Sequence, residues 1–281
     1  MARALPFIQA SVAVLLPLLA SVACSEDGPK DGGIPNMSDA GDNIPDGGSL
    51  DAGADADAGS PICSTSGEVP CEDESFIQLG LFQTVSTGSI AEEGTPGDFL
   101  SYIDATGGDI APTESYVYIR FTEQGLEKLD ISDEEAFASV DWDFAMRRFV
   151  ARLNSGVSGP SCAMAARTAP STDFDTLTTV PDGLEFRTEE YFTGESCEFI
   201  PDGSGFGSPG TALSSFWTYA DCLQMTGNIY ILALRGGRYA KLRFEAYYPP
   251  SRQTECNETG VVSQPSGSGN VRIRWAFIAS E

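Results

Sequence analysis

Apolar and polar residues alternate near the C-terminal end of this 281-residue chain, and this alternation constrains the fold more than any other feature. Successive side chains of a β-strand point to opposite faces, so the alternation over 239–248 predicts a strand with one buried and one solvated face. The alternating residues are Ala240, Leu242, Phe244 and Ala246 on one side and Tyr239, Lys241, Arg243 and Glu245 on the other. The apolar run 228–234 precedes it, and the intervening Gly236-Gly237 pair suits a tight hairpin turn because glycine accepts positive φ. A closing strand is predicted over 271–278.

The remaining patterns also favour strands. The segment 116–121 reads Tyr-Val-Tyr-Ile-Arg-Phe, and aromatic and β-branched residues are typical of strands. The segment 142–153 fits both helical and strand spacing, and its strand-rich surroundings favour a strand with a β-bulge at Arg147-Arg148. Ser132 and Glu135 have capping-box spacing, which predicts a short helix. We therefore predict an all-β fold, an antiparallel two-sheet domain with at most one or two short helices.

The N-terminal segment is typical of a secretory signal peptide. Arg3 precedes an apolar run that ends in small residues up to Ala23. Pro17 interrupts the run, which is shorter than the roughly 20 residues a membrane-spanning helix needs. Cys24 follows at once, as in bacterial lipoprotein signals whose cysteine is acylated with chains such as palmitate; the alternative is ordinary cleavage beside an incidental cysteine. The predicted organisation is a signal peptide over 1–23, a lipidated Cys24 with a disordered acidic tether over 24–62, and a β domain over 63–281.

Composition excludes several functions. The chain has no histidine, so it cannot form a Ser-His-Asp or Cys-His triad or a histidine zinc site. Its 16 Lys plus Arg against 41 Asp plus Glu give a formal charge of −25, which argues against nucleic acid as a partner. Residues 25–62 alone carry −8 and have too few large apolar residues to form a core. We predict no catalytic residues, no metal site and no enzymatic activity.

Six cysteines remain if Cys24 carries lipid. An even number in an exported chain favours three disulfides, and no Cys-x-x-Cys motif supports a redox or metal site. Pairing of nearest neighbours in the sequence is our hypothesis. It joins Cys63 with Cys71, Cys162 with Cys197, and Cys222 with Cys256.

The segment 142–148, Trp-Asp-Phe-Ala-Met-Arg-Arg, and its continuation 152–156, Arg-Leu-Asn-Ser-Gly, resemble the signature of the HmuY-like family of bacterial haem-binding lipoproteins. A Tyr-Val-Tyr strand before it, Pro-Asp-Gly at 181–183, the Arg-Gly-Gly turn at 235–237 and the closing strand follow the same order. The resemblance covers roughly 115–278. It implies an all-β protein, anchored by lipid on the outer membrane or released from it, with a haem pocket between loops at one end of the sheets.

The histidines that hold haem iron in such relatives are missing here. The resemblance places one of these ligands at Arg147 and the other in the loop 184–210. Since the chain has no histidine, bis-histidine ligation is impossible. Arg147 cannot replace the missing ligand, because a guanidinium has only hydrogen-bond donors. Remaining haem candidates are Met164 or Tyr191 toward iron, and Arg238 and Lys241 toward the propionates. The alternatives are that Met164 packs near Cys162 and that the cations offset acidic neighbours across the sheet. The glycine-rich stretch 203–210 is interpreted as a flexible loop.

The predicted function is that of a non-enzymatic exported lipoprotein, facing the periplasm or the cell surface, that binds haem or a related ligand without bis-histidine ligation. Its partners are then the membrane, through the lipid anchor, and haem or another small molecule or protein. The alternative is a surface binding or assembly module that keeps the scaffold and has lost haem binding.

Overall fold

The computed structural model describes residues 68–108 and 111–280. Within them, every pairing between named strands is antiparallel. The six-stranded sheet has the order β1 (Ile90–Glu92), β2 (Phe99–Asp104), β12 (Asn270–Ile278), β11 (Arg238–Ala246), β10 (Ile229–Leu234) and β7 (Met164–Arg167). The four-stranded sheet has the order β4 (Gly125–Leu129), β3 (Val117–Thr122), β5 (Phe144–Arg147) and β6 (Val150–Leu153), and β8 (Trp217–Tyr219) pairs with β9 (Leu223–Met225). The predicted all-β, two-sheet class is confirmed.

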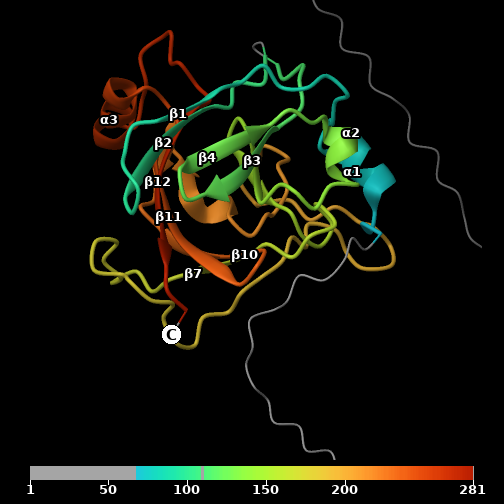
Figure 1. Ribbon diagram of the computed structural model, residues 1–281. Helices are drawn as coiled ribbons and strands as arrows, with labels where there is room; N and C mark the ends of the chain where they lie inside the picture. The colour runs from blue at the N-terminus through green and yellow to red at the C-terminus, as the bar shows by residue number, and fades with distance from the viewer. Residues whose placement is uncertain (1–67, 109–110, 281) are drawn as a thin grey trace, which may run out of the picture. The chain divides into compact units, whose positions relative to one another are not determined.

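Three short α-helices accompany the sheets in the described residues, one more than predicted: α1 (Glu72–Gln78), α2 (Asp133–Ala136) and α3 (Pro250–Thr259). Figure 1 shows α1 and α2 together at one end of the domain and α3 away from them. The capping box predicted at Ser132 and Glu135 is present at the start of α2. Helix α3 was not predicted, because its residues have no amphipathic pattern; it begins at a proline, which is well suited to a first helical turn.

The core lies between the two sheets, and aromatic pairs cross it. The ring of Phe121 on β3 stands edge-on to Trp275 on β12, with centroids 4.8 Å apart. Phe144 on β5 faces Phe244 on β11 at 6.4 Å. All four side chains are buried, and edge-to-face and tilted geometries are the ones that aromatic pairs prefer. These contacts hold the two sheets face to face.

The β10–β11 hairpin forms as predicted. Leu234 pairs with Arg238 at its end, and Gly236 and Gly237 in the turn have φ of 80° and 71°. Such positive values suit glycine. The two arms lie side by side in Figure 1.

The segment 142–153 is extended, as predicted, but the predicted bulge is wrong. Arg147 pairs with Val150, so β5 and β6 form a hairpin whose two-residue turn is Arg148 and Phe149. Arg148 adopts φ 54° to close this turn. The break in alternation therefore marks a reversal of the chain, and it presents Arg148 and Phe149 at one end of the four-stranded sheet.

The disulfides correct the predicted pairing. Cys71 is bonded to Cys197, with a Cα–Cα distance of 5.6 Å, although 126 residues separate them. The predicted Cys222–Cys256 bond is present. Cys162 is also disulfide-bonded, and Cys63 lies outside the described residues. Nearest-neighbour pairing fails because the loop after β7 folds back against α1, which brings Cys197 to the helix N-terminus.

The predicted signal peptide, Cys24 and the acidic tether lie outside the described residues. In the part that the structure describes, no helix is both long and apolar enough to cross a membrane.

Candidate functional site

A cavity of about 320 Å³ opens beside the β5–β6 turn. Parts of the chain that are distant in sequence form its walls, among them the end of α1, the turn itself and the glycine-rich loop. We call it the Arg148 cavity. The described residues that line it are Gln78, Leu79, Pro112, Tyr116, Arg147, Arg148, Phe149, Val150, Gly207, Ser208, Pro209 and Tyr247.

Arg147 is a fixed part of this wall. Its Nη2 donates to the carbonyl oxygens of Leu79 at 2.6 Å and Gly80 at 3.0 Å, and its Nη1 lies 3.4 Å from a carboxylate oxygen of Asp133. The guanidinium carbon stands 4.2 Å from the centre of the Tyr116 ring. Asp133 is fully buried and also accepts hydrogen bonds from backbone amides and the Tyr118 hydroxyl. Arg147 therefore ties α1 and α2 to β5 and has its charge balanced by Asp133.

Arg148 lies half-buried at the turn. Its backbone N–H donates to the Ala105 carbonyl oxygen at 2.6 Å, and its Nη1 donates to the Ser268 hydroxyl at 3.1 Å. Burial raises the pKa of the neighbouring Tyr247 to about 12, against the lowering effect of the Arg148 charge. At neutral pH the cavity therefore contains a phenol, not a phenolate, beside the arginine.

An aromatic cluster continues from the cavity to the surface. The Phe149 ring lies 5.6 Å from Phe206, 5.4 Å from Trp217 and 6.3 Å from Tyr247. Phe206 in turn meets Tyr219 edge-on at 4.8 Å. Phe206 and Tyr219 remain 47% and 51% exposed, although large apolar side chains are usually covered. The cluster thus offers accessible ring faces next to the cavity.

The charge of the cavity wall is opposite to that of the chain. Its described lining residues include two arginines and no Asp or Glu, whereas acidic residues outnumber basic ones by 41 to 16 overall. Anionic groups are attracted to such a wall. The arrangement suits a flat, partly apolar ligand that carries a carboxylate.

The same lining residues do not suit an iron centre. None of those described is His, Met, Cys or Lys, and the two phenols, Tyr116 and Tyr247, are the only side chains of a type that ligates haem iron. The high pKa of Tyr247 disfavours the phenolate that such a bond needs. The described lining therefore offers few side chains that could ligate a haem iron.

The four haem candidates taken from the sequence do not meet in one place. Met164 begins β7, where it pairs with Ala233 and is half-buried. Tyr191 is fully buried, its hydroxyl donates to the Val157 carbonyl oxygen at 3.4 Å, and burial raises its pKa to about 12. Neither residue lines the Arg148 cavity.

Lys241 and Arg238 are engaged with the protein itself. Lys241 lies on the face of β11 that was predicted to be wet, and this prediction is wrong at Lys241 because the segment around Phe174 covers it. Its ammonium donates to the carbonyl oxygens of Phe174 at 2.6 Å and Leu177 at 2.9 Å, and burial lowers its pKa. Arg238 donates to the Phe121 carbonyl oxygen at 3.2 Å.

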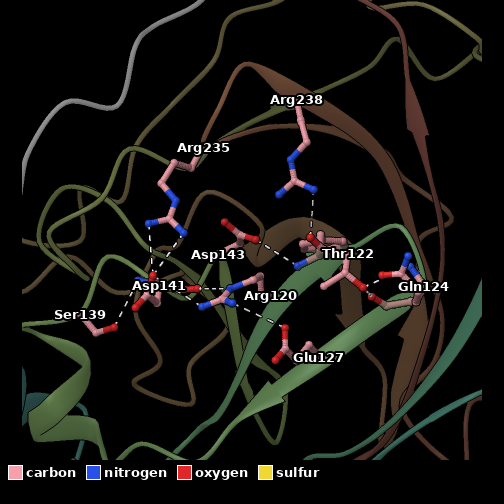
Figure 2. A network of polar contacts seen from close by, with 11 residues as sticks. Arg120, Thr122, Gln124, Glu127, Ser139, Asp141, Asp143, Arg235 and Arg238 are labelled. Carbon is pink, nitrogen blue, oxygen red and sulfur yellow. Dashed lines mark hydrogen bonds and ion pairs between the residues drawn. The ribbon is translucent and has the colours of Figure 1, made fainter.

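Figure 2 shows the surroundings of Arg238 and its neighbour Arg235. Arg235 lies 3.3 Å from the Asp141 carboxylate, which Arg120 also approaches at 3.5 Å. Asp143 accepts a hydrogen bond from the Phe121 amide at 3.0 Å, and burial raises its pKa. In this region the basic side chains bridge the two sheets instead of lining a ligand cavity.

Sequence reasoning missed Phe149, Phe206 and Tyr247. The one usable signal was Phe206, the only aromatic residue in the glycine-rich stretch 203–210. The family resemblance brings the loop 184–210 and the turn to one site, but no residue pattern indicates that Phe206 contacts Phe149.

A model of the HmuY protein family matches residues 112–259, and the chain therefore belongs to this family. The match contains the β5–β6 turn and most of the cavity wall.

Several solved structures are similar to the chain. One is described as an HmuY-like haem-binding protein from Bacteroides vulgatus, with 18% identity and a TM-score of 0.41 over 64% of this chain and 91% of that chain. A lipoprotein from Bacteroides fragilis has 13% identity and a TM-score of 0.36 over 69% and 95%. The apo HmuY analog from Tannerella forsythia has 15% identity and a TM-score of 0.35 over 71% and 98%. No curated protein matches.

Proposed function

We propose that this chain is a non-enzymatic, exported lipoprotein that holds haem or a related planar ligand in the Arg148 cavity without bis-histidine ligation. One observation carries the proposal: a cavity is present between the Arg147-Arg148 turn and the loop 184–210. These are the two segments in which the family resemblance places the ligand contacts. Its volume of about 320 Å³ falls at the lower end of the range of small-molecule sites, so a porphyrin would enter by one edge.

The test is a titration of the mature chain with ferric and ferrous haem, followed by absorbance. We expect a Soret shift on binding, without the low-spin spectrum of a bis-histidine complex, because the chain has no histidine. A Soret band unchanged from that of free haem, with protein whose circular dichroism shows a folded β domain, would refute haem binding.

The membrane anchor is a separate part of the proposal. Acylation of Cys24 would hold the protein at a membrane surface because each buried CH₂ contributes about 0.8 kcal/mol. Labelled palmitate should enter the wild-type protein and not a Cys24→Ala variant. Equal labelling of both proteins, or of neither, would contradict lipidation at Cys24.

A second candidate is a surface binding or assembly module that has lost haem binding. It is favoured by the missing iron ligands in the described cavity wall and by the exposed rings of Phe206 and Tyr219. The haem titration separates the two candidates, since only the first predicts a Soret shift.

A further inference from the structure

We propose that the Arg148 cavity recognises the flat face and the carboxylate of its ligand and makes no bond to a metal, so that it takes a metal-free tetrapyrrole dicarboxylate as readily as the iron complex. This inference rests on the proposed function, because it names what the same site selects. Three features of the structure carry it: the side chains available to a metal, the aromatic cluster, and the position of positive charge.

The side chains available to a metal are few and already engaged. Within the described lining only Tyr116 and Tyr247 carry an oxygen that ligates haem iron. Tyr116 is 2% exposed, and the guanidinium of Arg147 lies over its ring at 4.2 Å. Tyr247 is 3% exposed and contacts the rings of Phe149 and Tyr248. Both phenols are therefore almost fully covered by neighbouring side chains.

The aromatic cluster supplies contacts that do not depend on a metal. Phe149 comes from the β5–β6 turn, Phe206 from the glycine-rich loop, and Tyr219 from the end of β8. Their successive centroid distances are 5.6 Å and 4.8 Å. Stacking and edge contacts with such rings stabilise any flat conjugated ligand. Phe206 precedes Gly207 of the cavity wall, so the exposed rings extend the cavity toward solvent.

Positive charge lies on the cavity wall at the β5–β6 turn. The Arg147 guanidinium lies 3.4 Å from Asp133. Arg148 places a second guanidinium beside the cavity, where its Nη1 donates to the Ser268 hydroxyl at 3.1 Å. A guanidinium binds a carboxylate through charge-assisted hydrogen bonds, which are the stronger kind. A ligand carboxylate at Arg148 would place the conjugated ring against Phe149 and Phe206.

The experiment compares three probes on the mature chain by absorbance and by quenching of tryptophan fluorescence. The probes are haem, protoporphyrin IX, and protoporphyrin IX dimethyl ester. We expect the dissociation constants of haem and protoporphyrin IX to agree within about threefold, and the ester to bind at least about tenfold more weakly, because it cannot accept charge-assisted hydrogen bonds.

Variants locate the contacts. Arg148→Gln should weaken haem and protoporphyrin IX equally, by about tenfold, and Arg148→Lys should restore part of the loss. Phe206→Ala should also weaken both probes equally. Arg187→Gln is the matched control, since that exposed side chain lies outside the Arg148 cavity. Circular dichroism checks that every variant is folded.

The outcomes separate this inference from the proposed function. If haem binds and protoporphyrin IX is more than about thirtyfold weaker, the metal contributes, and the inference fails while the proposed function stands. If protoporphyrin IX binds and haem does not, haem is removed from the proposed function, and the equal affinity that the inference predicts is refuted. If no probe binds, both fail. If Arg148→Gln binds haem and protoporphyrin IX as tightly as the wild type does, the proposed contact between Arg148 and a ligand carboxylate is overturned.

Discussion

Replacement of Glu189 by glutamine should change the free energy of unfolding by an amount that increases between pH 5 and pH 8. Glu189 is fully buried, and its two carboxylate oxygens accept hydrogen bonds from the amides of Leu153 at 2.9 Å and Ala212 at 3.0 Å. Burial raises its pKa from 4.5 to about 7, while these two bonds and the Arg152 charge act in the opposite direction. A carboxyl that resists ionisation in the folded protein makes stability depend on pH.

The magnitude follows from that pKa difference. Between pH 4.5 and about 7 the folded chain retains a proton on Glu189 that the unfolded chain has released, so the free energy of unfolding falls as the pH rises. At 1.36 kcal/mol for each pH unit the loss is about 3 kcal/mol. Glutamine cannot ionise and lacks this loss. The NH₂ group of the glutamine would face one of the two backbone amides and could not accept its hydrogen bond. The loss of this hydrogen bond lowers the free energy of unfolding by about 1 kcal/mol.

The assay is urea unfolding of the wild type and Glu189→Gln at half-unit steps from pH 5 to pH 8. We expect the variant and the wild type to be of nearly equal stability at pH 5, because the wild type has already lost about 1 kcal/mol there, and the variant to be more stable by about 2 kcal/mol at pH 8. The acids with lowered pKa, Asp98, Glu135 and Glu255, titrate below this window and are common to both proteins. A constant difference across the window would refute the raised pKa of Glu189.

Three further changes test the structure. Arg147→Ala should lower the free energy of unfolding by about 3–5 kcal/mol in urea titrations, because it leaves the buried Asp133 carboxyl group without its ion-pair partner; an effect below 1 kcal/mol would contradict this role of Arg147. Gly156→Ala should also destabilise, by more than about 1 kcal/mol, since its φ is +55° and an added Cβ would lie 2.1 Å from the Glu189 carbonyl oxygen; a thermal melt unchanged from wild type would disprove that close approach. Removal of the Cys222–Cys256 bond, which closes a loop of 34 residues, should lower the free energy of unfolding by about 4 kcal/mol. If reduction of all disulfides in the wild type lowers it by the same amount, the other disulfides contribute nothing to stability.

Sequence patterns predict the structure correctly where the contacts that determine it join residues close together in the chain. The capping box of Ser132 and Glu135, the turn at Gly236-Gly237 and the alternation along β11 depend on neighbouring residues, and all three are present. Lys241 is the exception along β11, because a segment more than 60 residues earlier in the chain covers it. No local pattern reports such a covering segment.

The sequence by itself determined the all-β class, the order of the principal strands and the absence of histidine ligands, because strand periodicity and residue type do not depend on distant contacts. Tertiary structure alone decided that Cys71 meets Cys197 and that Phe149, Phe206 and Tyr247 gather beside Arg148. These residues come from loops whose paths depend on packing against α1 and the sheet ends. Spacing along the chain does not encode such distances, so the resemblance indicated the two segments at the site, and only the folded protein shows which side chains line the cavity.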